Sequence, residues 1–329
     1  MDFFKNIILK KEIFGNNKLI EDTTSLHIAF GIDANFTIGT GVLIYSILQH
    51  INNNNMVFHI FTDSIYPEDV SRFKELTYKA NNISIIIYYV NPNKFSTLPI
   101  FFTWSQAMYY RFIISKLLYN ITDNILYLDS DILCLNSFEN LFHQNFSSNI
   151  AGVVSDHDSM LNYAQKAFNL NSNYYFNSGF LIINLINWEK NNISDKAISL
   201  LLNKNNFKYY DQDVLNLLLA NKTLLLEKKY NTIYHLADMN TPFSNDTIFL
   251  HYSGSVKPWQ AWGQYHFLTP LWLKYKNNSP WKDVPIFQPK TYKQAKFMTR
   301  MSYRNKKFIK SIYWYIKYSF WKIKSKLKV

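Results

Sequence analysis

Apolar and polar residues alternate in blocks along the chain, and the block lengths are those of strands and helices. Short apolar runs predict four strands in the first 131 residues, at 26–33, 56–62, 83–90 and from Asn124 to the acidic pair Asp129 and Asp131. Apolar residues at helical spacing predict helices between them, at 37–50, 67–80 and 104–119. Repeated strand–helix–strand units predict an α/β fold with a mainly parallel sheet flanked by helices.

The pattern is less regular in the second half of the chain. It predicts strands at 150–156, 174–185 and 248–251, the second of them interrupted by Asn177-Ser178-Gly179. It predicts helices at 159–168, 188–204 and 211–220. Ligands of mainly parallel sheets bind beyond the carboxyl ends of the strands, which is where Asp33, Asp129 and Asp131 stand.

Asp129 and Asp131 follow an apolar strand with one residue between them. Because side chains alternate along an extended chain, both carboxylates point to the same side. Two buried carboxylates repel each other unless something neutralises them, and a divalent cation does so. The pair is equally compatible with an ordinary polar loop, so the tripeptide alone leaves both interpretations open.

A second candidate segment follows the strand predicted at 248–251. His251 would add a neutral imidazole to the two carboxylates, and this mixed ligand set suits Mn²⁺ better than Mg²⁺ or Ca²⁺. Gly254 would let backbone N–H groups approach a phosphate closely, and Lys257 would neutralise it. A histidine at a strand end is also commonly structural, so His251 keeps that alternative.

Composition narrows the class of protein. With 329 residues, 48% of them hydrophobic, and only 8 Gly and 9 Pro, the chain has the composition of a packed globular protein. Its single cysteine, Cys134, excludes an intrachain disulfide and a Cys-based zinc site, favours a reducing cytoplasm, and stands in an apolar run that indicates a buried side chain. No apolar run approaches the roughly 20 residues of a transmembrane helix, and the first residues lack the pattern of a signal peptide.

The net charge of +12 belongs to the C-terminal tail. Residues 290–329 contain 13 Lys and Arg and no acid, which leaves 22 basic and 23 acidic residues for the rest. Trp314, Tyr315 and Trp321 add rings of the kind that sit at a membrane interface. Apolar residues recur every three or four positions, with lysines on another face, at Phe308, Ile312, Ile316, Phe320, Ile323 and Leu327.

We interpret this tail as a helix lying on an anionic membrane surface. The same periodicity would also bury a helix that folds back onto the rest of the chain, so that alternative stays open. A basic patch with aromatic residues is also typical of nucleic-acid binding. The rest of the chain is nearly neutral and contains no recognised nucleic-acid module, so we expect no nucleic-acid partner.

Six segments carry a family resemblance in the same order along the chain. They are Phe30-Gly-Ile-Asp33-Ala-Asn35, Tyr110-Arg111-Phe, Leu126-Tyr-Leu-Asp129-Ser-Asp131, Tyr175-Phe-Asn177-Ser-Gly179, Tyr210-Asp211-Gln212-Asp213 and His251-Tyr-Ser-Gly254-Ser-Val-Lys257. Together they resemble the family 8 retaining glycosyltransferases, and within them the bacterial 1,2-glucosyltransferases and galactosyltransferases of the lipopolysaccharide core.

The resemblance implies a GT-A fold and a division of the chain. The catalytic domain would span about 26–275, with a nucleotide-sugar half at about 26–131 and an acceptor half at about 132–275. Residues 1–25 would form an N-terminal extension, and 276–329 a basic, helical extension that associates with the membrane. The enzyme would be cytoplasmic and peripheral on the inner face of the cytoplasmic membrane.

The resemblance also implies roles for individual residues. Asp129, Asp131 and His251 match metal ligands for Mn²⁺, with Mg²⁺ as the alternative, and with Ser130 they would face the diphosphate of a UDP-sugar. The remaining nucleotide and diphosphate contacts match Ile32, Asp33, Asn35, Phe36, Gly254 and Lys257. The positions around the donor sugar match Arg111, Asp156, Asn177, Asp211 and Gln212. Two structural alternatives remain, Asp211 as a helix cap and Arg111 as a surface ion pair.

The implied reaction moves glucose or galactose from UDP-glucose or UDP-galactose to a hexose of the lipopolysaccharide core. Gln212 stands where a carboxylate nucleophile would be needed for a covalent intermediate, and an amide is a poor nucleophile. We therefore favour a front-face route, with Asp156 or Asp213 as a transient nucleophile in the alternative. A membrane-recruited nucleotide-sugar-binding protein without turnover is the alternative function. The sequence does not choose between glucose and galactose.

Overall fold

The computed structural model describes residues 3–51, 54–78, 81–100, 105–170, 174–203, 207–235 and 242–327. The chain divides into two compact units. The first contains residues 1–232 and 244–250, and the second contains residues 233–243 and 251–329. Outside the main sheet, β10 (Thr232–His235), β11 (Phe249–Ser253) and β6 (Ile132–Cys134) form a three-stranded sheet in that order.

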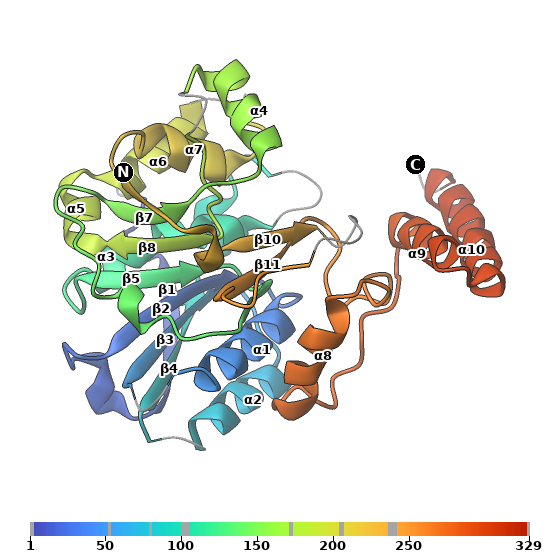
Figure 1. Ribbon diagram of the computed structural model, residues 1–329, viewed down its shortest axis with the longest axis horizontal. Coiled ribbons are helices and arrows are strands. Elements are labelled where there is room, and N and C mark those ends of the chain that lie inside the picture. Colours follow the sequence, from blue (N-terminus) through green and yellow to red (C-terminus); the bar gives the residue numbers. More distant parts are fainter. Residues whose placement is uncertain are drawn as a thin grey trace. The chain divides into compact units, whose positions relative to one another are not determined.

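Within the described residues, eight strands form one sheet in the order β1-β4-β3-β2-β5-β8-β7-β9 (Figure 1). The chain from β4 through β3 and β2 to β5 is parallel, as is the pair β7 and β9, whereas β1 and β8 run antiparallel to their neighbours. The bounds are β1 Ile8–Gly15, β2 Leu26–Ile32, β3 Met56–Thr62, β4 Ile83–Val90, β5 Asn124–Leu128, β7 Ala151–Val154, β8 Phe180–Asn184 and β9 Thr223–Leu226. The mostly parallel α/β sheet predicted from the sequence is therefore confirmed.

Helices cover both faces of this sheet (Figure 1). On one face, a continuous apolar core joins strand residues such as Ile125 and Ile183 to helix residues such as Ile114, Trp188 and Val214. Burial on both faces explains why the central strands are almost entirely apolar. The α-helices of the first unit are α1 Thr37–Leu48, α2 Pro67–Tyr78, α3 Ile114–Leu118, α4 Asp158–Phe168, α5 Leu185–Lys190, α6 Ile193–Asn203 and α7 Tyr210–Leu218. Short 3₁₀ helices are η1 Asn17–Ile20, η2 Pro92–Phe95, η3 Gln106–Phe112, η4 Glu139–Leu141 and η5 Lys228–Tyr230.

Three predicted elements differ from the structure. The helix predicted at 104–119 is the 3₁₀ helix η3 followed by the short α3, because the spacings of three and four residues are hard to distinguish in a short segment. Only the end of the strand predicted at 174–185 is a strand, β8, because residues 177–179 turn the chain. The helix predicted at 188–204 is split into α5 and α6, with Asn192 at φ 52° between them. The predicted ends at 79–80, 104 and 204 lie outside the described residues.

The second unit continues from β11 into three helices, α8 (Thr269–Asn278), α9 (Tyr292–Arg304) and α10 (Phe308–Lys326). A capping box between Thr291 and Gln294 starts α9, and α9 packs against α10. Among the described residues, no helix combines the length and the apolar character needed to cross a bilayer. Cys134 in β6 is fully buried, as predicted, and burial raises the pKa of its thiol.

Candidate active site

The turn between β5 and β6 presents Asp129, Ser130 and Asp131. Contacts from two other segments help to hold it in place. Ser130 Oγ accepts a hydrogen bond from Thr40 Oγ1 of α1 at 2.9 Å, and the backbone N–H of Asp129 donates to the carbonyl of Gly179 at 2.7 Å. The acidic turn is therefore fixed from a helix and from the loop that precedes β8.

Asp129, Asp131 and His251 form a cluster suited to a metal ion. One ligand atom from each residue lies within 4.8 Å of the other two. Asp131 and His251 are buried, and Asp129 is partly exposed. His251 follows Leu250 on β11. Two carboxylates and one imidazole fit a divalent transition metal such as Mn²⁺ better than Ca²⁺, which prefers more oxygen ligands.

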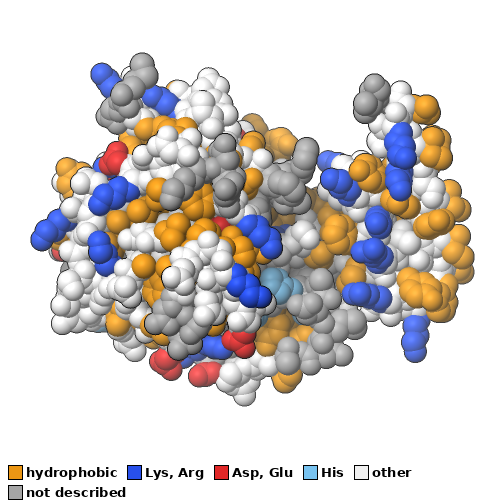
Figure 2. Space-filling model, turned by 90° about the horizontal axis from the view of Figure 1, so that it is seen from above, with side chains coloured by type: hydrophobic (Ala, Val, Ile, Leu, Met, Phe, Trp, Pro, Cys, Tyr) orange, Lys and Arg blue, Asp and Glu red, His pale blue; other side chains and the backbone are white. Residues whose placement is uncertain are grey.

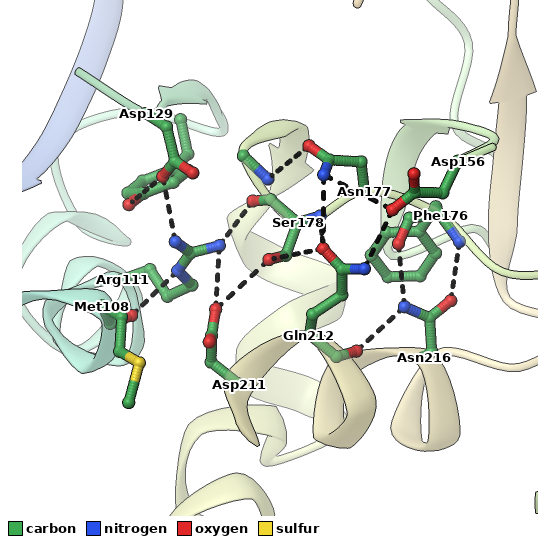
Figure 3. A network of polar contacts seen from close by, with 12 residues as sticks. Met108, Arg111, Asp129, Asp156, Phe176, Asn177, Ser178, Asp211, Gln212 and Asn216 are labelled. Atoms are coloured by element: carbon green, nitrogen blue, oxygen red, sulfur yellow. Dashed lines mark hydrogen bonds and ion pairs between the residues drawn. The ribbon is translucent and has the colours of Figure 1, made fainter. Parts of the chain in front are cut away.

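Arg111 is the cation at the centre of the polar network shown in Figure 3. Its Nη2 donates to Asp129 Oδ1 at 3.0 Å, and its Nη1 lies 3.2 Å from Asp211 Oδ2. Nε donates to the carbonyl of Met108 at 2.9 Å, and Nη1 also donates to the carbonyl of Ser178. The side chain is 4% exposed, so this is a buried ion pair and not the surface pair that the sequence left open.

Burial and neighbouring charges shift the pKa values of Arg111 and Asp211 in opposite directions. Burial alone lowers the pKa of the Arg111 guanidinium, but neighbouring Tyr127, Asp211 and Asp129 outweigh it and the net shift is upward. Burial raises the pKa of Asp211 to about 6, although Arg111 opposes that shift. The guanidinium also lies over the Tyr127 ring, 4.4 Å from its centroid. The cation therefore stays charged between two carboxylates.

Gln212, on α7, has both ends of its amide engaged (Figure 3). Its Nε2 donates to Asp156 Oδ2 at 3.0 Å, while its Oε1 accepts from the backbone N–H of Ser178 at 3.1 Å and from Asn177 Nδ2 at 3.3 Å. The other oxygen of Asp156 accepts from the backbone N–H of His157 at 2.7 Å. The structure thus brings three predicted sugar-site residues, Gln212, Asp156 and Asn177, into one network.

Asp213 follows Gln212 on α7 and is fully buried. Its Oδ2 accepts from the Tyr163 hydroxyl and from the backbone N–H of Tyr209, both at 2.9 Å, and its Oδ1 accepts from the Tyr175 hydroxyl. The proximity of Asp213 adds to burial in raising the pKa of both tyrosine hydroxyls, so both remain protonated donors. With two tyrosines and one N–H, Asp213 joins α4, α7 and the segment before β8.

The loop from Ile32 to Phe36 connects the end of β2 to α1. Asp33 Oδ1 accepts from the backbone N–H of Asn35 at 2.8 Å, and its carbonyl accepts from the N–H of Phe36 at 3.0 Å. Ile32 is buried, whereas Asn35 is exposed. Asp33 therefore shapes this turn through its side chain and its carbonyl.

Gly254 and Lys257 lie in the second unit, beyond β11. Gly254 has φ 85°, a conformation that L side chains rarely adopt, and an added Cβ would stand 3.1 Å from His235 Nδ1. Lys257 Nζ donates to the carbonyl of Tyr252 at 3.0 Å, and the side chain is buried. Glycine at position 254 is therefore required by the backbone itself.

Sequence reasoning missed three residues that support the network. Ser178 supplies a carbonyl to Arg111 and an N–H to Gln212, and Asn216 Oδ1 accepts from the N–H of Phe176 at 2.8 Å. Tyr127 donates its hydroxyl to Asp129 at 2.9 Å. The contacts of Ser178 and Asn216 involve backbone groups, and the identity of a residue does not reveal such contacts. Of the three, only Asn216 could have been found from sequence, because it is a polar residue within the apolar stripe of a predicted helix.

A mostly parallel α/β sheet that ends in an acidic turn, with a buried polar network beside it, is the arrangement expected of a GT-A glycosyltransferase. Fold comparison agrees: the crystal structure of the galactosyltransferase LgtC in complex with donor and acceptor sugar analogues matches with a TM-score of 0.66 and 22% identity, over 77% of this chain and 96% of that chain. The family model for glycosyl transferase family 8 matches residues 27–263, and the model for the family 8 C-terminal region matches 269–322. The chain belongs to glycosyl transferase family 8 and is a hexosyltransferase, which confirms the family resemblance of its motifs.

Curated relatives align over almost the whole chain. Lipopolysaccharide 1,3-galactosyltransferase of Salmonella typhimurium is 35% identical over 329 residues, covering 96% of this chain and 97% of that protein. Lipopolysaccharide glucosyltransferase WaaO of Escherichia coli is 33% identical over 336 residues, covering 98% of both. Lipopolysaccharide 1,2-glucosyltransferase of Escherichia coli is 35% identical over 303 residues, covering 86% of this chain and 87% of that protein.

Proposed function

We propose that this hexosyltransferase moves glucose or galactose from a UDP-sugar to a hexose of the lipopolysaccharide core, with retention of configuration. The observation that carries the proposal is the metal-type cluster of Asp129, Asp131 and His251, with Asp129 tied through Arg111 to the network of Gln212. The proposal is supported by relatives named as lipopolysaccharide galactosyl- and glucosyltransferases along nearly the full chain. In this proposal, residues 26–275 form the catalytic part and 276–329 the membrane-associating extension.

Asp129, Asp131 and His251 would hold Mn²⁺, with Mg²⁺ as the alternative. A bound divalent cation supplies Lewis-acid stabilisation of the diphosphate leaving group. Lys257 and the backbone beside Gly254 would add a cation and N–H donors for the same phosphates. Ser130, between the two aspartates of the acidic turn, would face the same diphosphate. The acidic turn is already fixed, so it would hold the cation in place before negative charge develops on the leaving group.

The nucleoside would lie against the loop after β2. Asp33 and Asn35 offer a carboxylate and an amide for hydrogen bonds to uracil and ribose, while Phe36 offers a ring for stacking and Ile32 an apolar floor. The donor sugar would meet Arg111, Asp211 and Asn177, whose fixed positions can select hydroxyl orientation. This is the region where a choice between glucose and galactose would be made.

For retention we favour a front-face transfer. The bond between the anomeric carbon and the diphosphate oxygen breaks, the acceptor oxygen bonds to the same face of that carbon, and the acceptor proton passes to a β-phosphate oxygen. Gln212 would stabilise positive charge at the anomeric carbon. Asp156 and Asp213 are the alternative nucleophiles, but Asp156 accepts bonds on both oxygens and Asp213 is held by two tyrosines, so neither is poised to attack.

We also propose that the C-terminal helices attach the enzyme to an anionic membrane on the cytoplasmic side. The six periodic apolar residues of the tail remain exposed in the structure, by 55–82%, although α10 packs on α9. Figure 2 shows lysine and arginine side chains gathered on one flank of these helices and hydrophobic side chains on another. An exposed apolar stripe flanked by lysines is typical of helices that bind lipid surfaces.

Two measurements test the proposed function. The first is UDP release from UDP-glucose and from UDP-galactose, with Mn²⁺, in the presence and absence of truncated core lipopolysaccharide. Release that depends on acceptor is expected from one of the two donors. A protein that binds UDP-sugar but releases no UDP with any acceptor would be the alternative, a binding protein without turnover.

The second measurement is thermal unfolding of the metal-free protein titrated with Mn²⁺, which needs no turnover. A ligand at 100 times its Kd stabilises the folded state by about 2.7 kcal/mol, and Tm rises accordingly. We expect this rise in the wild type and its loss in Asp131→Asn. Asp158→Asn, at an exposed acid, is the control and should keep the rise. Equal Mn²⁺ stabilisation of wild type and Asp131→Asn would refute the metal assignment.

A further inference from the structure

The turn between α9 and α10 borders a hollow that the proposed active site does not use. Two adjoining pockets that open to solvent, of about 780 and 280 Å³, share Gln288, Lys307 and Lys310 in their walls. All their lining residues belong to the second unit. The larger one is lined mainly by apolar surface and includes Phe308, Ile309, Tyr313 and Trp314, and the smaller one is more polar. This combination of apolar wall and a few polar groups is typical of small-molecule sites.

Lysines converge on this hollow. Lys306, Lys307 and Lys310 all line it. Lys306 has φ 59°, a left-handed conformation uncommon for a residue other than glycine, so the turn that presents the three lysines is a strained one. Its N–H donates to the carbonyl of Tyr303, and that of Lys307 donates to Ser302, both at 2.9 Å, which fixes the turn.

Two of the lysines meet at a single aromatic ring. The Nζ of Lys307 lies 5.2 Å from the centroid of the Tyr265 ring, and the Nζ of Lys310 lies 5.6 Å from the same centroid. The two ammonium groups are therefore separated by no more than the sum of these two distances, and at low ionic strength like charges repel over such a separation. The residues that line the hollow in the described part of the chain include no acid, and residues 290–329 contain none at all. An anion that entered the hollow would relieve this repulsion through charge-assisted hydrogen bonds.

The other walls indicate what carries the anion. Tyr265 and Tyr313 supply aromatic surface that a pyranose can contact, and the side-chain amides of Gln264 and Gln288 can exchange hydrogen bonds with hydroxyls. A compact lysine ammonium suits a phosphate as a point charge. We infer that this hollow is a binding site for a phosphorylated saccharide, held by Lys307 and Lys310 at the phosphate and by the aromatic and amide side chains at the sugar.

The inference rests on the proposed function in one respect, which is that the natural ligand would be a phosphate-bearing sugar of the acceptor. A lipopolysaccharide acceptor is a saccharide on a lipid, so a second contact outside the transfer site would hold it by a part that does not react. Remote binding of this kind positions a substrate. A phospholipid head group carries the same phosphate chemistry, and the experiment must separate the two sources.

The test uses the full-length protein and no turnover. Glucose 6-phosphate, inorganic phosphate and glucose are titrated, and binding of the two phosphates is followed by ³¹P line broadening and that of glucose by ¹H saturation transfer. We expect glucose 6-phosphate to bind more tightly than phosphate and much more tightly than glucose. Lys307→Gln/Lys310→Gln should weaken the binding of glucose 6-phosphate at least tenfold. The matched control is Lys322→Gln/Lys326→Gln, two exposed lysines later on α10, which should leave it unchanged.

Two further arms decide the location and the source. Saturating UDP-glucose should not displace glucose 6-phosphate, and displacement would show binding at the donor site and overturn the inference. Substitution of either lysine pair should reduce sedimentation with vesicles of phosphatidylcholine and phosphatidylglycerol by the same amount. If the first pair weakens vesicle binding more than the control pair but leaves glucose 6-phosphate unchanged, the hollow serves lipid head groups and the inference fails. Because no arm measures UDP release, failure here leaves the proposed function standing.

Discussion

Gln212 donates through Nε2 to Oδ2 of Asp156 at 3.0 Å, while its Oε1 accepts from the backbone N–H of Ser178 at 3.1 Å. An ionised carboxylate only accepts and a backbone N–H only donates, so these two partners fix which end of the amide faces which way. The network therefore orients Gln212 before any substrate binds. A preformed arrangement of dipoles needs no reorganisation when charge develops.

Gln212→Glu should lower kcat while leaving the fold intact. The substitution is nearly isosteric, but it replaces the Nε2 donor with an oxygen that faces the Asp156 carboxylate. Two close carboxylates repel, and the network would shift or take up a proton. We expect kcat to fall at least tenfold, equivalent to about 1.4 kcal/mol in the barrier. Gln165→Glu, at an exposed position of α4, is the control, and an unchanged kcat in Gln212→Glu would contradict the role given to this amide.

Arg111→Met should destabilise the protein strongly. It removes a buried cation and leaves Asp129 and Asp211 facing each other without it. Breaking a buried ion pair by removing one partner costs about 3–5 kcal/mol. Urea unfolding should show that the free energy of unfolding falls by this amount. Arg72→Met provides the matched comparison. Arg72 pairs with Asp69 at 2.9 Å on the partly exposed face of α2, so its loss should cost less than about 1 kcal/mol. Similar losses in the two variants would mean that the Arg111 pair contributes no more than a surface pair.

The central strands could be predicted from sequence because they are buried on both faces. β2, β3 and β4 match the predicted 26–33, 56–62 and 83–90 to within one residue. β1 was missed, since Lys10, Lys11 and Glu12 interrupt its apolar pattern at the exposed edge of the sheet. β6 has only three residues, and the four-residue strands β9 and β10 are only partly buried, so none of them gives a clear apolar run. Strand length and exposure thus limited the prediction.

The candidate site was predictable only in part, for a different reason. Asp129 and His251 are 122 positions apart, and nothing in the spacing of residues shows that such distant positions meet; the family motifs supplied that link. The interpretation of Arg111 stayed open because exposure cannot be read from a single arginine in a mixed segment. Ser178 acts mainly through its backbone carbonyl and N–H, which every residue has. Contacts of that kind emerge only from the fold.

Replacing three exposed residues of α10 should reduce membrane binding without loss of stability. Ile312, Ile316 and Phe320 are exposed by 61–64%, so Ile312→Ser/Ile316→Ser/Phe320→Ser removes little packing. Each apolar side chain that enters a lipid surface contributes about 1.5 kcal/mol or more, so binding to vesicles should fall at least a hundredfold. Sedimentation with anionic vesicles measures this, with Ile186→Ser on α5 as an exposed apolar control. Equal sedimentation of wild type and triple variant would contradict the membrane role of the tail.

The buried histidine pair should make the protein sensitive to acid. His27 Nδ1 lies 2.9 Å from His59 Nε2, and His59 Nδ1 lies 3.1 Å from the Tyr88 hydroxyl. Burial lowers the pKa of His27 to about 4 and places that of His59 well below its usual value. Above about pH 6.5 the two histidines are neutral in both the folded and the unfolded protein, so the free energy of unfolding does not depend on their titration. Below it the unfolded chain binds protons that the folded chain does not, so stability is lost as the pH falls.

At pH 5 the loss should reach about 2 kcal/mol for each histidine relative to pH 7. His27→Phe/His59→Phe removes both groups, and the difference in urea unfolding free energy between pH 7 and pH 5 should shrink by about 4 kcal/mol. His143→Phe, at an exposed position, controls for the loss of a histidine elsewhere. If the double variant keeps the full wild-type difference between the two pH values, groups other than this pair determine the acid sensitivity.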